Sequence, residues 1–196
     1  SRRFLKSYTV FNSCQIEGIA FPEVQHPERT KTGVLESAEA IIREMPNPPA
    51  MHEGRKPFPC YLKSTDTIEM PARGSFRSDP DYYLTMFHEM SHATGHSSRL
   101  ARRTLLENQG INATGEARRI YSEEELVAEM ATAFVCASLG IVPTVRHADY
   151  IGNWLQVLKE DARAVVKAAS LASKACDFIL AFKAEAQSTN DLEQAA

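Results

Sequence analysis

The chain has 196 residues, of which 43% are hydrophobic and 24% charged, and its formal net charge at pH 7 is -3. This length suits a single domain, with room for an appendage, and the composition excludes a disordered or fibrous protein. A slightly acidic chain has no overall attraction for polyanions, so its net charge does not indicate nucleic-acid binding.

Two patterns bear on the cellular compartment. No apolar run approaches the ~20 residues that a membrane span requires, and the chain does not open with the pattern of a signal peptide. The four cysteines are scattered and form no C-x-x-C pair, which favours free thiols in a reducing compartment. We therefore expect a cytoplasmic protein that does not contact a membrane.

The first part of the chain predicts a helix and a small sheet. Residues 1–30 hold a short strand-like run and irregular sequence, and we interpret them as the end of a preceding domain or as a linker. Apolar residues with a period of 3.6 predict a helix over residues 34–45. Residues 46–59 hold five of the ten prolines and are expected to form a loop. Residues 61–62 and 67–70 then predict two strands, paired as a hairpin.

The best-marked helix is expected over residues 80–94. It has a proline in its first turn, Ser78 or Asp79 as its N-cap, and Gly95 at its end. A polar loop over residues 97–121 is expected to follow it.

The remaining elements are also predicted to be helical. The next helix is expected to begin after Ser122, with Glu125 in capping-box spacing, and to stop at Gly140. Two further helical segments cover residues 148–160 and 162–186, and residues 187–196 read as a frayed tail. Residues 31–186 are therefore expected to form one α+β domain, with a small sheet packed on the 80–94 helix and a helix-rich C-terminal half.

The 80–94 helix carries the sequence His88-Glu89-Met90-Ser91-His92, an H-E-x-x-H motif. Residues four apart share one face of a helix, so both imidazoles can bind one metal ion. Glu89 then lies beside a metal-activated water and can act as its general base. The motif predicts a zinc-dependent metallopeptidase with a zincin fold, although another divalent metal is compatible with these ligands.

A third metal ligand has to come from outside the motif, and three candidates remain. A metzincin would carry a further histidine at the position of Ser98, so this chain departs from that class. His96 is one turn beyond His92, but the helix is expected to end before it. The acidic candidates on the next helix are Glu125, which the capping box would also occupy, and Glu129, whose apolar neighbours make an unpaired carboxylate costly.

The segment Glu125-Leu-Val-Ala-Glu129 resembles the corresponding helix of gluzincin-type peptidases. This resemblance implies that Glu125 is the third metal ligand and that Glu129 accepts a hydrogen bond from His88 or His92. We favour this assignment. Other residues near the motif are given minor roles: Glu123 and Glu124 as solvated charges, Tyr121 as a packed side chain, and His147 as a surface or capping residue.

Taken together, four stretches resemble the C-terminal domain of ArdC-type antirestriction proteins of conjugative plasmids and related mobile elements. The resemblance covers roughly residues 60–185 and includes Thr67-Ile-Glu-Met-Pro71, His88 to Leu100, Glu124 to Phe134 and His147 to Asp161. It implies protection of incoming DNA from restriction in a bacterial cytoplasm. In that family a single-stranded-DNA-binding domain precedes the metallopeptidase-like domain, and residues 4–12 resemble the last strand of that domain.

Two functions follow from these observations. The first is hydrolysis of a peptide or protein substrate, with Glu89 moving the proton. The second is a non-catalytic, metal-stabilised module that binds DNA or a restriction enzyme. Single-stranded DNA remains a possible partner through the N-terminal residues, while the natural substrate and the oligomeric state are not indicated by the sequence.

Overall fold

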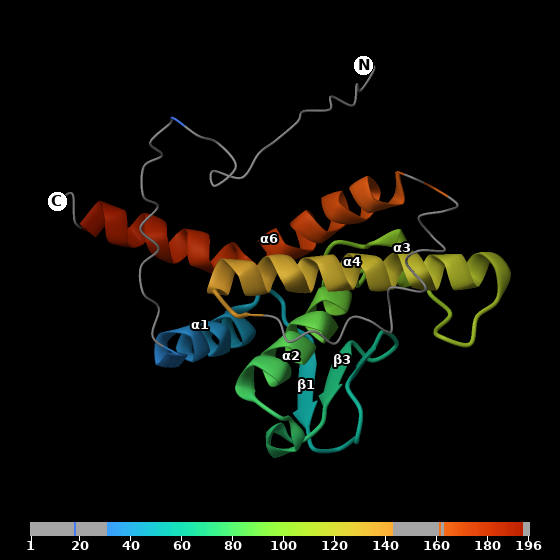
Figure 1. Cartoon of the computed structure of the whole chain (residues 1–196), viewed down its shortest axis with the longest axis horizontal. Coiled ribbons are helices and arrows are strands. Elements are labelled where there is room, and N and C mark those ends of the chain that lie inside the picture. Colours follow the sequence, from blue (N-terminus) through green and yellow to red (C-terminus); the bar gives the residue numbers. More distant parts are fainter. Residues whose placement is uncertain (1–17, 19–30, 143–160, 162, 194–196) are drawn as a thin grey trace.

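The computed structural model of this protein describes residues 18, 31–142, 161 and 163–193 (Figure 1). Within these residues a three-stranded sheet lies beneath a set of helices, which is the α+β arrangement predicted from the sequence. Apart from Gly18, residues 1–30 lie outside the described part, so their interpretation as the end of another domain stays a prediction.

Helix α1 (Lys31–Glu44) confirms the first predicted helix and begins three residues earlier than the periodicity indicated. Its apolar side chains pack into the main hydrophobic core, where Ala38 and Ile41 are buried together with Met45, which follows the helix. The apolar face of α1 therefore holds it against the rest of the domain.

The sheet contains β1 (Ala50–Glu53), β2 (Cys60–Leu62) and β3 (Thr67–Met70) in the order β1-β3-β2. β2 and β3 are antiparallel, as the predicted hairpin requires, with Leu62 opposite Thr67. β1 pairs in parallel with β3, which places Met51 opposite the fully buried Ile68.

The existence of β1 corrects the prediction that residues 46–59 form a loop. The five prolines of this segment lie before and after the strand, at 46, 48, 49, 57 and 59, so none of them blocks its hydrogen bonds. β1 has only four residues and no β-branched side chain, so it forms because the neighbouring strand supplies partners for its backbone and for Met51.

Helix α2 (Asp79–Thr94) is the predicted motif helix, preceded by a short 3-10 turn, η2 (Arg73–Ser75). Its N-cap is Ser78, whose hydroxyl accepts a hydrogen bond from the backbone of Asp81, and a proline stands in the first turn. Tyr83 and Phe87, one turn apart, are fully buried in the main core. The helix ends at Gly95, as predicted.

Helix α4 (Gly115–Leu139) begins earlier than the sequence suggested, and this is the main correction to the predicted fold. Ser122 was expected to cap the helix, but it lies in the third turn and is buried. The segment 97–121 is thus not a continuous loop, because it contains the short helix α3 (Arg103–Leu106) and the first two turns of α4. Gly140 caps the end of α4 with a left-handed backbone, as expected.

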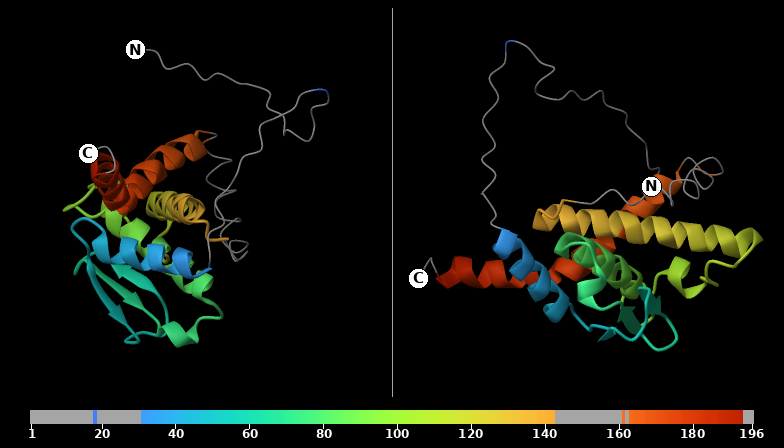
Figure 2. Two further views of the ribbon diagram at one scale, coloured as in Figure 1. Left: turned by 90° about the vertical axis from the view of Figure 1, so that its left-hand side faces the viewer. Right: turned by 60° about the horizontal axis from the view of Figure 1, so that its bottom comes forward.

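Helix α6 (Ala164–Glu193) confirms the predicted helix over 162–186 and continues through residues expected to be frayed. It packs across α4 (Figure 2). Small residues belong to this contact, where Ala131 of α4 and Ala172 and Ala175 of α6 are fully buried in one cluster. The predicted helix over 148–160 lies outside the described residues. No helix in the described part is long and apolar enough to cross a lipid bilayer.

The cysteines in the described residues, Cys60, Cys136 and Cys176, are all free thiols, as predicted. Burial raises the pKa of Cys136 to about 12 and that of Cys176 to about 11, which keeps both protonated. Cys14 lies outside the described residues.

Candidate metal centre

The motif helix brings two imidazoles to one point. His88 and His92 lie four residues apart on α2, so their rings stack edge to face with centroids 4.7 Å apart. Their Nε2 atoms are separated by 3.1 Å. Two polar nitrogens that converge in a partly buried position are arranged to share a partner.

Glu125 reaches the same point from α4, which packs across α2. Its two carboxylate oxygens each lie 3.5 Å from one imidazole, Oε2 from Nε2 of His88 and Oε1 from Nε2 of His92. Among the described residues, these three form the one group of histidine, cysteine and acidic side chains close enough to hold a metal ion together.

The spacing of these ligand atoms fits a divalent metal ion. Nitrogen and oxygen ligands about 2.0–2.1 Å from a tetrahedral zinc are separated from one another by about 3.3–3.4 Å. The separations of 3.1 and 3.5 Å bracket this value. Two imidazoles and one carboxylate are also a donor set that zinc accepts while keeping a position for substrate or water.

Glu89 lies next to His88 and only 6% of its surface is exposed. A carboxylate in this position, beside a set of converging ligands, is suited to accept a proton from a bound water. The Glu89 carboxylate is close enough to His88 to raise the pKa of that imidazole. Its role as general base, expected from the sequence, stays a prediction.

The charges around His88 have a measurable consequence when no metal is bound. Burial by itself lowers the pKa of His88, but the carboxylates of Glu125, Glu89 and Glu129 outweigh burial and raise it to about 9. Burial likewise raises the pKa of Glu125, but the two neighbouring imidazoles hold it below its usual range. The carboxylates around His88 therefore favour its protonated, positively charged form.

Glu129 also approaches the motif, one turn beyond Glu125 on α4. Its Oε1 lies 3.6 Å from Nδ1 of His88, close enough for an ion pair but longer than a hydrogen bond. The sequence predicted that Glu129 accepts a hydrogen bond from His88 or His92. In the structure Glu129 contacts His88, at a distance longer than a hydrogen bond.

The residue that sequence reasoning missed is Glu124. It was expected to be a solvated charge, but it is completely buried and accepts a hydrogen bond of 3.0 Å from Nδ1 of His92. Arg102 and Thr104 also donate to its carboxylate, and these contacts, against the opposing effect of burial, lower the pKa of Glu124 to about 2. Glu123, by contrast, lies toward the surface and pairs with Arg119.

The correct start of α4 would have revealed Glu124. Once the helix begins at Gly115, Ile120, Glu124, Val127 and Ala131 fall on one buried stripe with helical spacing. An acid in an apolar stripe predicts a buried partner. The assumed capping box at Ser122 concealed this pattern.

Two other candidates, His96 and Tyr121, take no part in the group. His96 directs Nδ1 toward the hydroxyl of Ser98 at 2.8 Å and lies 3.9 Å from Asp66. The Tyr121 ring packs against the guanidinium of Arg118, as expected for a packed side chain. His147 lies outside the described residues.

Comparison with known proteins places these residues in a family context. A model of the zincin-like metallopeptidase family matches residues 36–171, a range that contains the whole site. The crystal structure of the antirestriction protein ArdC from plasmid R388 with Mn(II) bound superposes with a TM-score of 0.64 at 35% identity. The alignment covers 90% of this chain and 62% of that one. The metal-free ArdC structure gives a TM-score of 0.63 at 33% identity, over 88% of this chain and 58% of that one.

Two sequence relatives extend this comparison. A DNA primase TraC of Escherichia coli is 38% identical over 176 residues, which is 89% of this chain but 15% of that protein. The uncharacterised protein y4eC of Sinorhizobium fredii is 34% identical over the full chain, which corresponds to 60% of its own length. The chain thus spans only part of each of these larger proteins.

Proposed function

The chain belongs to the zincin-like metallopeptidase family, and we propose that it hydrolyses peptide bonds at a zinc ion held by His88, His92 and Glu125. The predicted zincin fold and the resemblance to ArdC are both confirmed by the comparisons. The observation that carries the proposal is the convergence of these three ligand groups beside the buried carboxylate of Glu89.

The residues of the chain divide the chemistry between them. When bound, a zinc ion supplies Lewis-acid polarisation of the substrate carbonyl and makes a water molecule more acidic. Glu89 takes the proton from the attacking water and passes it to the leaving amine. Burial of Glu89 limits competing contacts between its carboxylate and solvent.

Zinc is proposed as the native metal, with manganese as the alternative. The two separations of 3.5 Å are nearer to the tetrahedral value than to the spacing of about 3.0 Å between neighbouring ligands of a small octahedral ion, while the 3.1 Å between the imidazole nitrogens is nearer to the octahedral spacing. The choice of zinc therefore rests on the donor set of two imidazoles and one carboxylate. The related ArdC structure contains Mn(II). Elemental analysis of the chain purified without added metal is expected to find zinc near one equivalent, whereas manganese at that level would contradict the assignment.

In its biological setting, we place this domain in an antirestriction protein that acts in the cytoplasm of a bacterium. Its partners are then a peptide or protein substrate and, through a preceding domain, single-stranded DNA. A second function has one observation in its favour: the relatives are named for antirestriction and priming, not for proteolysis. In that alternative the metal fastens α2 to α4 and the surface binds DNA or a restriction enzyme.

Replacing Glu89 by Gln separates the two functions. The Glu89→Gln chain is expected to bind metal and fold normally but to lose hydrolysis of a general protein substrate by at least about a hundredfold. Glu116→Gln, an exposed acid paired with Arg119, serves as the matched control and should leave hydrolysis unchanged. Full protection of incoming DNA by the Glu89→Gln protein would favour the non-catalytic module.

A further inference from the structure

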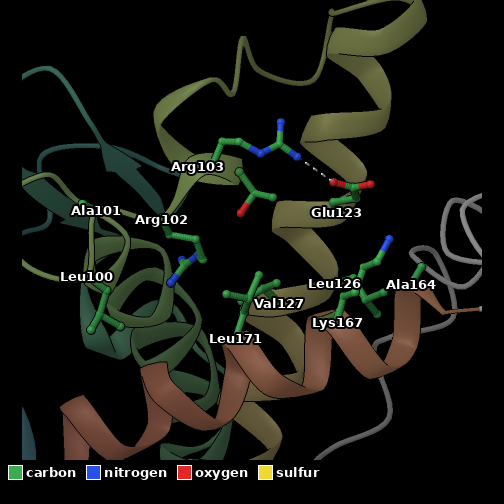
Figure 3. A pocket seen from close by; sticks show the side chains of 12 residues that line it. Leu100, Ala101, Arg102, Arg103, Glu123, Leu126, Val127, Ala164, Lys167 and Leu171 are labelled. Atoms are coloured by element: carbon green, nitrogen blue, oxygen red, sulfur yellow. Dashed lines mark ion pairs between the residues drawn. The ribbon is translucent and has the colours of Figure 1, made fainter. Parts of the chain in front are cut away.

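Two neighbouring arginines between α2 and α4, Arg102 at the N-cap of α3 and Arg103 in its first turn, have opposite environments (Figure 3). The side chain of Arg103 is 58% exposed and forms ion pairs with Glu107 and Glu123 at the surface. The side chain of Arg102 is 3% exposed. A guanidinium that is removed from water needs a full set of acceptors, so Arg102 calls for an explanation.

Arg102 finds its acceptors on both helices of the metal centre. Its Nε and one terminal nitrogen donate to the two oxygens of Glu124 on α4, at 2.9 and 2.6 Å. The other terminal nitrogen donates to the Thr94 hydroxyl at 2.9 Å, and the Ser91 carbonyl accepts a further bond of 2.9 Å. Arg102 therefore ties the end of the motif helix to α4 through a two-pronged contact with one carboxylate.

The contacts of Glu124 determine how His92 is presented to the metal. Arg102 is a permanent donor, and the Thr104 hydroxyl lies 2.6 Å from Oε2, so the carboxylate acts as acceptor toward each neighbour. The bond of 3.0 Å from His92 Nδ1 to Oε1 then requires the hydrogen to be on Nδ1. Nε2, which faces His88 and Glu125, is left with its lone pair available.

We propose that Arg102 is a positioning residue which, through Glu124, fixes the ring orientation and tautomer of His92 and thereby sets the affinity of the metal centre. The inference rests on the proposed metal site. Arg102 does not touch the ligand atoms; it keeps the carboxylate of Glu124 in the position from which that carboxylate can hold His92.

Geometry, rather than charge alone, explains why an arginine occupies this position. A lysine would keep the positive charge but would offer a single ammonium in place of the planar fork that matches both oxygens of Glu124. Room for the guanidinium comes from Gly95, since a Cβ built there would lie 2.8 Å from Arg102. Arg102 also borders a cavity of about 370 Å³ whose mainly apolar lining includes Leu126 and Leu171, and Glu123 is the one acidic residue among the described residues that line it (Figure 3).

The test compares Arg102→Lys with Arg103→Lys in the full chain. Zinc affinity is measured by competition with a chelating dye, at a temperature where both variants are folded by circular dichroism. Loss of an outer contact to a ligand histidine weakens metal binding by about 10- to 100-fold. We expect this loss for Arg102→Lys and no change for Arg103→Lys. Thr104→Val, which removes one bond to the same carboxylate, gives a milder loss and covers the case in which Arg102→Lys does not fold.

A second readout needs no metal. In the metal-free chain, ¹⁵N NMR of His92 should show the hydrogen on Nδ1, and Arg102→Lys should shift the population toward the other tautomer. Unchanged zinc affinity and unchanged His92 resonances in folded Arg102→Lys would overturn the inference. A wild-type chain that binds no metal would refute the proposed function instead, and the NMR comparison would then decide the positioning role by itself.

Discussion

Gly95 offers a direct test of how closely the loop after the motif helix packs. A Cβ added at this position would lie 2.8 and 2.9 Å from two guanidinium atoms of Arg102 and 2.9 Å from Cβ of Leu105. Real Cβ atoms do not approach other atoms this closely. Leu105 Cβ is fixed on α3, and the guanidinium is held by Glu124, Thr94 and Ser91, so neither neighbour can move without losing contacts.

Gly95→Ala is therefore expected to destabilise the domain. The backbone of Gly95 has φ -77°, which any residue adopts, so the cost comes from crowding alone. Inserting a carbon into a packed region costs about 1–3 kcal/mol. For a chain of this size each kcal/mol lowers the melting temperature by roughly 2–4 °C, which gives a decrease of about 2–12 °C. Urea denaturation and thermal melting of the metal-free chain measure both quantities.

The matched control is Gly74→Ala, because a Cβ at Gly74 would meet nothing within 4 Å. Its stability should stay within about 0.5 kcal/mol of the wild type. If the stability of Gly95→Ala also stays within about 0.5 kcal/mol of the wild type, Gly95 and Arg102 do not lie as close together as the structure shows. The guanidinium of Arg102 would then not be held in its described position.

Three further predictions concern the ligands, the pH dependence and a second buried arginine. In zinc titrations by calorimetry, Glu125→Ala should lose most of the affinity, Glu129→Ala should lose about 10- to 100-fold, and His96→Ala should change little; a site abolished by Glu129→Ala but untouched by Glu125→Ala would reverse the assignment. In the metal-free chain the pKa of His88 is raised to about 9 from 6.5, so protonated His88 contributes stability that is complete below pH 6.5 and is lost as the pH rises to 9. The urea midpoint should fall between pH 6.5 and about pH 9, and this fall should disappear in His88→Ala. A midpoint that does not change with pH in the wild type would contradict the effect of the neighbouring carboxylates on His88. Arg99→Met should cost roughly 2–4 kcal/mol, because the fully buried side chain of Arg99 binds Asp66 and the carbonyls of Ala93 and Asn47; the exposed Arg43→Met is the control, and equal stability of the two variants would count against the network.

Local sequence signals were sufficient to predict those elements whose ends are set by neighbouring residues. Ser78, the following proline and Gly95 mark both ends of α2 within one residue, because caps and backbone-restricted residues act locally. The hairpin of β2 and β3 is likewise confirmed. β1 could not be predicted, since its four residues become a strand only when β3 provides partners from a distant part of the sequence.

In the candidate site, too, the residues that depend on local structure were predicted and the one that depends on a distant contact was not. His88, Glu89 and His92 are recognisable because one helix turn brings them together and the motif encodes that turn. The contact between His92 and Glu124 joins two helices, so it depends on where α4 begins and on how α2 crosses it. A misplaced helix start assigned Glu124 to the solvent and gave Ser122 a capping role that a buried residue in the third turn cannot have.

The arrangement of charges explains why the centre is expected to need a cation to complete it. His92 contacts Glu124 through Nδ1 and Glu125 through Nε2, while His88 contacts Glu129 through Nδ1 and Glu125 through Nε2. Glu89 adds a fourth buried carboxylate beside them, and Arg102 is the one buried guanidinium among the described residues that touches this group. The resulting excess of three negative charges is costly in a site of low exposure. A divalent ion removes most of this excess, and without it the raised pKa of His88 makes a proton the partial substitute. Metal binding should therefore release a proton at neutral pH, and calorimetric titrations in buffers of different ionisation enthalpy would detect it as a buffer-dependent heat. Heats that are independent of the buffer would mean that His88 is already neutral and that the acidic surroundings are compensated in some other way.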